Sequence, residues 1–405
     1  MRSRGILHAL SWALLVAVAL LIGPVARQLP AVNGNLAADA YGGWAGVLRV
    51  WVCGGWAPGG GSFIPWLNGC SARFERRHPG VYVQMQSVSA DAIAAFLSGE
   101  LGPPDAILFA PGMLPSGEGL SPLAAPPALR EALTDVGLWQ GELRALPVAL
   151  GGYAWVLNQS LVQAVPHDWS TLPAPAPVKK QPRYLMQVPA DQPYLNWSGA
   201  LNALCAPRQV GVEPSPAPRA GQGIDLGLPI ASEPTPVPPE PATQTVLCRL
   251  PALLPGDFRA GASAYEAFLS GKVAAIPATQ REIRRLQLLS DAGRAPNWSV
   301  AGGGGAFSDQ LLMAGVPDGA DEAERRALAR AWVDWLLRDD SQAALTGIRA
   351  LRVTTGDALY AGQMGMAELE QAMGGRLEAP NAFDTRWRER EAAEADRLVR
   401  ESRAG

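Results

Sequence analysis

The sequence predicts an α/β fold with a mostly parallel sheet, and two observations carry that prediction. Apolar runs that suit buried strands alternate with segments of helical spacing between residues 48 and 109. The order strand, helix, strand, helix, strand requires crossover connections, which place successive strands parallel to one another. The chain has 405 residues, which is enough for two domains and a large core.

The first elements follow one another closely. A buried strand is expected at 48–53, and a helix at 63–77, where apolar residues recur at helical spacing until His78-Pro79-Gly80. Strands at 81–88 and 106–109 and a short helix at 90–98 complete this part. Because ligands bind beyond the carboxyl ends of strands in such sheets, the loops at 54–62 and 110–119 are expected at the mouth of a site.

The apolar segment at 146–158 has Gly151-Gly152 in its middle. Two interpretations remain open: a strand that crosses between domains at a glycine kink, and an ordinary internal strand. Farther along, Asp321 and Glu324 form a capping-box pattern ahead of a helix that extends to Leu336. The other expected elements are helices at 262–270 and 280–289, strands at 272–276 and 311–316, a turn at 340–342 and a helical tail with Trp387.

The N-terminal segment at 1–40 is typical of an export signal. Arg2 and Arg4 precede an apolar run from Ala9 to Ile22, which Gly23-Pro24 ends. A cleaved signal peptide and an uncleaved membrane anchor with a linker fit it equally. Both place the bulk of the chain outside the cytoplasm, in the periplasm or on the extracellular face of the membrane.

Four cysteines form an even set, which suits an oxidising compartment. Four cysteines allow three pairings, and we expect the two that are local in sequence, Cys53–Cys70 and Cys205–Cys248. No Cys-x-x-Cys or Cys/His cluster favours a metal site. The second pair would pinch the neck of a proline-rich surface insertion at 207–243.

Charge is nearly balanced, with a formal net charge of −3 and no basic block. We therefore expect no nucleic-acid partner. Nothing in the sequence indicates a cofactor or a catalytic residue set: there is no Gly-x-Ser-x-Gly elbow and no His-Glu-x-x-His helix.

The order of several short segments resembles the extracellular solute-binding proteins of ABC importers, specifically the maltose-binding type. The resemblance covers about residues 48–387. It rests on 74–81, Pro104-Asp105, Leu146-Pro147 followed by Asn158, 166–172, 268–274, 331–337 leading into 340–342, and Pro380-Asn381 ahead of Trp387.

This resemblance implies a type II periplasmic-binding-protein-like fold. Each of its two lobes holds a mostly parallel sheet flanked by helices, and crossing strands form the hinge. The first lobe would consist of 48–150 and 311–352, and the second of 151–310 and 353–405. The implied function is capture of a small solute, with a carbohydrate favoured, in the cleft between the lobes, followed by delivery to an ABC permease. The resemblance implies a monomer and no enzymatic activity.

The resemblance also implies the residues that contact the solute. Pro193 suits the first turn of a helix, and Gln192 and Tyr194 match the family's sugar-binding helix start, with Trp197 packed behind them. The residues alone also leave open that the rings of Tyr194 and Trp197, which share one helix face, both belong to the core. The remaining implied contacts are Trp56 and Met113 after the first and third strands, Gln280 and Arg281 after a later strand, and Trp387 in the tail.

Two departures from the family keep other functions open. The loop at 110–114 has no acid, and Gly151 stands where the family can carry one. Either the pocket is more apolar or wider than a maltodextrin site, or the ligand is not a sugar. The alternatives are a membrane-tethered, solute-binding-like scaffold or sensor without a transport role, and an exported hydrolase, for which a carboxylate pair would be needed.

Overall fold

A computed structural model describes residues 44–97, 99, 102–162, 184–188, 259–260, 264–301, 306–318, 323–374, 377–387 and 393. Several predictions lie outside the described residues. They concern the N-terminal segment 1–40, the ligand residues Gln192 and Tyr194, the pair Cys205–Cys248 and the insertion 207–243.

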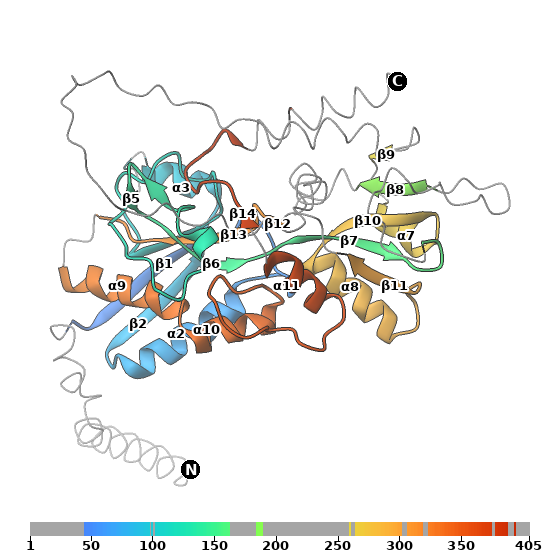
Figure 1. The fold of residues 1–405 in the computed structure, drawn as a ribbon. Helices are drawn as coiled ribbons and strands as arrows, with labels where there is room; N and C mark the ends of the chain where they lie inside the picture. Colours follow the sequence, from blue (N-terminus) through green and yellow to red (C-terminus); the bar gives the residue numbers. More distant parts are fainter. Residues whose placement is uncertain are drawn as a thin grey trace, which may run out of the picture.

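The chain forms two five-stranded sheets (Figure 1). The first has the strand order β2-β1-β3-β13-β6, in which β1, β2, β3 and β6 are parallel to one another and β13 runs against them. The bounds of these strands are β1 Gly46–Cys53, β2 Val81–Ser87, β3 Ala106–Phe109, β6 Leu146–Leu150 and β13 Leu311–Gly315.

The second sheet has the order β11-β7-β10-β8-β9, and here β7 is the strand that runs against the others. Its bounds are β7 Tyr153–Asn158, β8 Tyr184–Val188, β9 Arg259–Ala260, β10 Val273–Thr279 and β11 Trp298–Ala301. Two small strand pairs complete the described sheets: β4 Leu138–Trp139 with β5 Glu142–Leu143, and β12 Ala306–Phe307 with β14 Leu377–Glu378.

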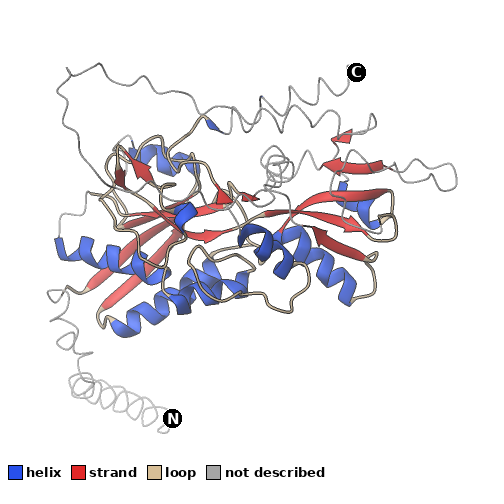
Figure 2. Cartoon of the chain, in the orientation of Figure 1, coloured by secondary structure: helices blue, strands red, loops and turns tan. Residues whose placement is uncertain are grey.

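Helices cover both sheets, and Figure 2 shows α2, α10, α11 and α8 along the lower side of the molecule. Helix α2 packs on β2 and α9, whereas α7 and α8 pack on β10, and α11 packs on β7, β11 and α8. Their bounds are α2 Ile64–Arg77, α3 Ala90–Leu97, η2 Glu131–Leu133, α7 Ala264–Leu269, α8 Gln280–Asp291, α9 Ala323–Leu336, α10 Asp339–Ala343, η4 Ala344–Ile348 and α11 Met366–Gly374.

The core follows from the alternation and the helical spacing of apolar residues. On β1, Leu48 and Val50 are each 1% exposed, whereas Val47, which points to the other face, is 44% exposed. Strands β3, β6 and β13 are buried at every position. Burial on both faces is expected for β3 and β13 inside the sheet. The end strand β6 is covered by Leu351 and Gln342, which hydrogen-bond to its backbone. Buried apolar residues of the two sheets form one connected cluster.

Of the two interpretations of 146–158, the structure favours a crossing at the glycine pair, from one sheet to the other. Strand β6 belongs to the first sheet and β7 to the second, and only Gly151-Gly152 separates them. A second connection returns through 308–310 into β13. The two connections lie side by side, because the Gly151 N–H donates to the Gln310 carbonyl at 2.7 Å.

The C-terminal part differs from the predicted division into lobes. The range 353–405 is expected beside the second sheet, and α11 does pack there. The described residues 381–387 instead return to the first sheet's side: the Ala382 N–H donates to the Val136 carbonyl at 2.7 Å, and the Phe383 ring lies 6.2 Å from that of Phe109. Ala382 and Phe383 are buried, as are Val136 and Phe109, and the packing of these apolar side chains stabilises residues 381–387 beside the first sheet.

The predicted turn at 340–342 is wrong, because these residues lie inside the short helix α10. Two acidic residues, Asp339 and Asp340, occupy its first turn, where they interact favourably with the helix dipole. Buried Gln342 also fixes the segment, since its Nε2 donates to the Val148 carbonyl at 2.9 Å. Strand β10 likewise extends beyond the expected 272–276 to Thr279.

Among the residues that the structure describes, no helix combines the length and the apolar character that crossing a membrane requires.

Candidate functional site

The carboxyl edges of the two sheets meet at one place, which we call the junction. Cys53 pairs with Phe109, so the loops that follow β1 and β3 leave the same edge of the first sheet. Strand β6 ends at that edge and continues into β7. In the second sheet Thr279, the last residue of β10, pairs with Tyr153, the first of β7. Open α/β sheets bind ligands at such edges.

Gln280 connects four segments at the junction. It begins α8, and its side chain is fully buried. Its Nε2 donates to Gln310 Oε1 at 2.8 Å and to the Ala57 carbonyl at 3.3 Å, while its Oε1 accepts from the Gly152 N–H at 3.1 Å. Both amide hydrogens are therefore used within the protein. Gln280 is predicted to contact the solute, but in this structure its side-chain hydrogen bonds go to other residues of the junction.

The returning connection contributes a polar triplet, Ser308-Asp309-Gln310. Ser308 Oγ donates to the Gly151 carbonyl at 2.9 Å and accepts from the Gln310 N–H at 3.1 Å. Tyr153, which begins β7, donates its hydroxyl to Asp309 Oδ1. All these side chains are buried, so the two crossing segments are joined by hydrogen bonds inside the protein.

The glycine-rich loop after β1 packs against the backbone of Ile348 and Arg349. The Gly60 N–H donates to the Ile348 carbonyl at 2.7 Å, and the Gly59 N–H to the Arg349 carbonyl at 3.2 Å. A Cβ at Gly59 would lie 2.5 Å from Arg349 Cβ, so this close approach requires glycine. Arg349 itself has a positive φ of 55°.

Trp56 lies in this loop beside Gln280's partner Ala57. Its ring meets Phe63 edge-on, with centroids 4.7 Å apart, and it is 6% exposed. Within the described residues its Nε1 has no hydrogen-bond acceptor. A buried indole N–H normally finds a partner, so Trp56 is a donor without an acceptor at the carboxyl edge of the first sheet.

Trp387 packs on the loop that contains Met113, although both residues were expected to face a solute. A Cβ at Gly112, next to Met113, would lie 3.1 Å from Trp387 Nε1. Trp387 is 4% exposed, and Met113 Sδ accepts from the N–H of Ala110 in its own loop at 3.4 Å. In this state Trp387 packs on the loop after β3, not on an open cleft.

Arg281 is exposed in the first turn of α8, where its backbone N–H donates to Thr279 Oγ1 at 3.2 Å. Thr279 and Glu282 complete a capping box at this helix start. The junction therefore contains Trp56 and Gln280 of the predicted contacts that the structure describes, and Arg281 follows at its outer side.

Cys53 and Cys70 are separate buried thiols, so the predicted Cys53–Cys70 disulfide is wrong. Cys53 ends β1 beside Phe109, whereas Cys70 lies within α2, where its Sγ accepts from Arg73 at 3.3 Å. The two positions serve different packing contacts. Burial raises the pKa of both thiols, which disfavours the reactive thiolate.

Ser308, Asp309 and Gln310 are junction residues that sequence reasoning missed. A signal was present, because three consecutive polar residues stand directly before an apolar strand at 311–316. Nothing in the sequence indicated their partners, which lie about 150 positions away at Gly151 and Tyr153.

In the part of the chain that the structure describes, no three His, Cys, Asp or Glu side chains gather as a metal site would require. Comparison of the sequence with models of known protein families finds no match, and comparison with curated proteins finds none either.

Proposed function

We propose that this chain is an extracytoplasmic solute-binding protein whose two sheets form the lobes of a type II clamshell. In this proposal the glycine kink and the returning connection act as the hinge. A small solute, with a carbohydrate favoured, is held between the carboxyl edges, and the closed form delivers it to an ABC permease. The protein works as a monomer without a cofactor.

The single observation that carries the proposal is the meeting of both carboxyl edges at a junction that two short segments cross. Each sheet has one reversed strand, β13 or β7, and both of these strands connect directly to the crossings. Hinge closure requires few connections between two rigid bodies, with residues at element ends that absorb the change. Gly151 and Gly152 stand at such ends.

Trp56 supports a solute with hydroxyl groups. Its indole offers an apolar face together with an N–H that lacks a protein acceptor among the described residues. A sugar hydroxyl would supply that acceptor, and the ring would cover an apolar face of the sugar. Gln192 and Tyr194 remain proposed contacts from the second lobe.

The test is a thermal-shift screen of the chain against oligosaccharides, polyols and amino acids. A receptor gains stability only from the class that it binds in its folded state. Trp56→Phe keeps a large aromatic ring but removes the N–H. Without solute this variant should be as stable as the wild type or more stable, because a buried unpaired donor costs about 1–3 kcal/mol. With solute its midpoint should rise less.

One outcome would contradict this function, and another would contradict the role of Trp56 alone. One is turnover of a panel member, which would favour an exported hydrolase. The other is an equal solute-induced shift in Trp56→Phe and wild type, which would remove Trp56 from the site.

A second function, a solute-binding-like scaffold or sensor without a transport role, has one observation in its favour. Trp387, one of the expected solute contacts, is 4% exposed and packs on the loop after β3. If no panel member shifts the thermal midpoint, this second function is the better account.

A further inference from the structure

Two arginines from different elements lie over one indole ring. Their contacts are with residues outside the junction. Arg77 ends α2, and Arg338 connects α9 to α10. Their guanidinium carbons lie 5.0 Å and 4.7 Å from the ring centre of Trp335. Trp335 is 5% exposed and its Nε1 donates to the Cys70 carbonyl at 3.1 Å, so a fixed ring positions both cations.

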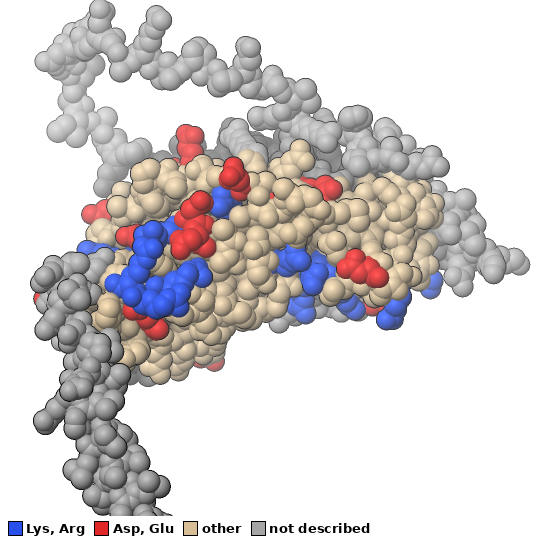
Figure 3. Space-filling view, turned by 90° about the horizontal axis from the view of Figure 1, so that it is seen from below, with Lys and Arg blue, Asp and Glu red and all other residues tan. Residues whose placement is uncertain are grey.

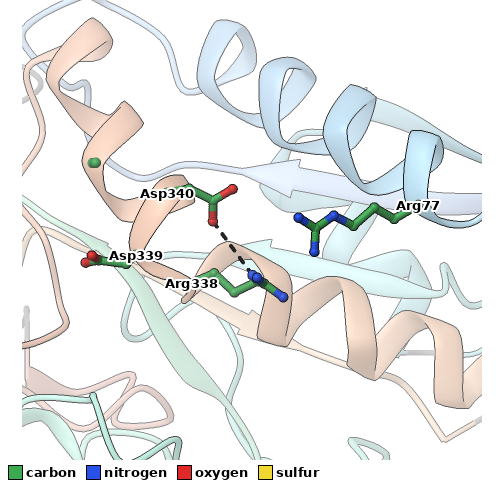
Figure 4. Close-up of a pocket in the computed structure, with 5 residues that line it drawn as sticks. Arg77, Arg338, Asp339 and Asp340 are labelled. Atoms are coloured by element: carbon green, nitrogen blue, oxygen red, sulfur yellow. Dashed lines mark ion pairs between the residues drawn. The ribbon is translucent and has the colours of Figure 1, made fainter.

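The same two arginines line two adjoining surface hollows of about 500 Å³ and 440 Å³. Figure 4 shows the two guanidinium groups pointing toward one another across the first hollow, with Asp340 beside them and joined to Arg338 by their ion pair. Figure 3 shows a group of Lys and Arg side chains on the left of the underside of the molecule, with Asp and Glu side chains beside it.

Asp339 and Asp340 line the first hollow with the two arginines, and Asp334 lines the adjoining hollow. Asp339 pairs with Arg352 at 2.9 Å. Asp340 is shared between Arg73 at 3.8 Å and Arg338 at 3.7 Å. No described carboxylate forms an ion pair with Arg77.

Arginines at helix ends have an ordinary structural explanation, because positive charge interacts favourably with a helix C-terminus. That explanation covers Arg76, which is exposed in the same last turn of α2 and lines neither hollow. It does not explain why Arg77 and Arg338, on separate elements, face one another although like charges repel. An anion between them would relieve that repulsion.

We propose that the hollow between Arg77 and Arg338 binds a phosphate group. Two guanidinium groups offer planar pairs of N–H donors, which match the oxygens of a phosphate in bidentate fashion. The phosphate is either a free phosphate or phosphate monoester, or the headgroup of an anionic lipid. This site shares no residue with the junction, so the proposal of phosphate binding can be tested independently of solute binding.

The first test titrates inorganic phosphate into the full chain at low ionic strength, by calorimetry. The wild type should bind phosphate, more weakly as salt is added because the site is open to solvent. Arg77→Gln and Arg338→Gln should each weaken binding by about tenfold or more, because each removes a charge-assisted pair of hydrogen bonds. Arg77→Lys keeps the charge but loses the planar fork, so its affinity should lie in between.

Arg76→Gln is the matched control, since it removes the same charge from the adjacent position without touching the hollow. It should bind phosphate within about twofold of the wild type, the change expected from a screened exposed charge. Circular dichroism checks that each variant is folded. If Arg338→Gln fails to fold, because it also loses its pair with Asp340, the comparison of Arg77→Gln with Arg76→Gln decides alone.

The second test separates the two sources of phosphate by cosedimentation with vesicles of phosphatidylglycerol or phosphatidylcholine. The site binds a lipid headgroup if the protein sediments with phosphatidylglycerol vesicles but not with phosphatidylcholine vesicles. Arg77→Gln should then lose this sedimentation, and Arg76→Gln should keep it. Phosphate binding without sedimentation assigns it to a soluble phosphate. The proposal is overturned if neither probe binds, or if Arg77→Gln and Arg76→Gln weaken binding equally.

Discussion

Gln280 is a buried amide whose hydrogen bonds all go to segments distant in sequence. Its partners are Ala57 in the loop after β1, and Gly152 and Gln310 in the two connections between the sheets. A buried donor or acceptor that loses its partner incurs a desolvation penalty. Removing the Gln280 side chain should therefore destabilise the protein by more than the net free energy of its hydrogen bonds. Gln280 thus links stability to the relative position of the two sheets.

We predict that Gln280→Ala lowers the free energy of unfolding by about 1–3 kcal/mol, because the Gly152 N–H and Gln310 Oε1 lose their hydrogen-bond partner. Gln287→Ala, on the same helix at a half-buried position, should change it by less than about 0.5 kcal/mol. Urea denaturation of both variants measures the difference. Equal losses would show that Gln280 contributes only helix packing.

Tyr265 on α7 offers a prediction about pH. Burial, with the nearby Glu282 and Glu266, raises the pKa of its phenol to about 12, against the opposing effect of Arg285. In the unfolded chain the phenol has its ordinary pKa of 10.0, so the unfolded state binds fewer protons than the folded state between these two pH values. Stability must therefore fall as pH rises through that interval and level off above it.

The measurement is phenolate absorbance against pH, as the difference between wild type and Tyr265→Phe. Its midpoint should lie near 12 while the protein remains folded. A midpoint near that of a free tyrosine would mean that the phenol is open to water.

At the scale of elements, the β4–β5 hairpin shows what turn geometry demands. Its two-residue loop is Gln140-Gly141, and both residues have positive φ, 51° and 83°. Such a loop is a type I′ turn, which favours Asn or Gly at the first position. Glutamine there is strained, because its Cβ crowds the backbone.

Gln140→Gly should therefore raise the free energy of unfolding by about 1 kcal/mol, as the left-handed strain is removed. Gly141→Ala should lower it by a similar amount, about 1 kcal/mol, because it introduces that strain. Thermal and urea unfolding of the pair test the argument. A stabilising Gly141→Ala would contradict the assigned turn.

Most elements with strong periodicity were predictable from the sequence. Helix α2 begins and ends within one residue of the expected 63–77, because Trp66, Leu67, Cys70 and Phe74 mark one face and His78-Pro79-Gly80 stops it. Helix α10 was missed, because its stability comes from Gln342 reaching Val148 and Leu336, which no local pattern encodes. The candidate site was predictable only as loops at strand ends.

At the scale of the whole molecule, the two sheets are joined at a junction where space is limited. A Cβ at Gly151 would lie 2.3 Å from Gln310 Oε1 and 2.8 Å from Gln280 Nε2. The sequence indicated the kink but not this crowding, because Gln280 and Gln310 reach it through tertiary contacts. The close approach fixes how the crossing segments lie.

Gly151→Ala should lower the free energy of unfolding by about 1–3 kcal/mol, the usual cost of forcing an extra methyl into a packed site. Gly347→Ala is the control, since nothing lies within 4 Å of a Cβ there. Urea denaturation compares the two. A fully stable Gly151→Ala would show that the junction can widen without cost.

The central claim is that the two sheets close about the junction when a solute binds. The most direct measurement is the distance between spin labels at Arg76 on α2 and Leu288 on α8, both exposed, with and without each solute of the screening panel. The account predicts a shorter distance with the solute class that raises the thermal midpoint. An unchanged distance with every member of the panel would contradict it.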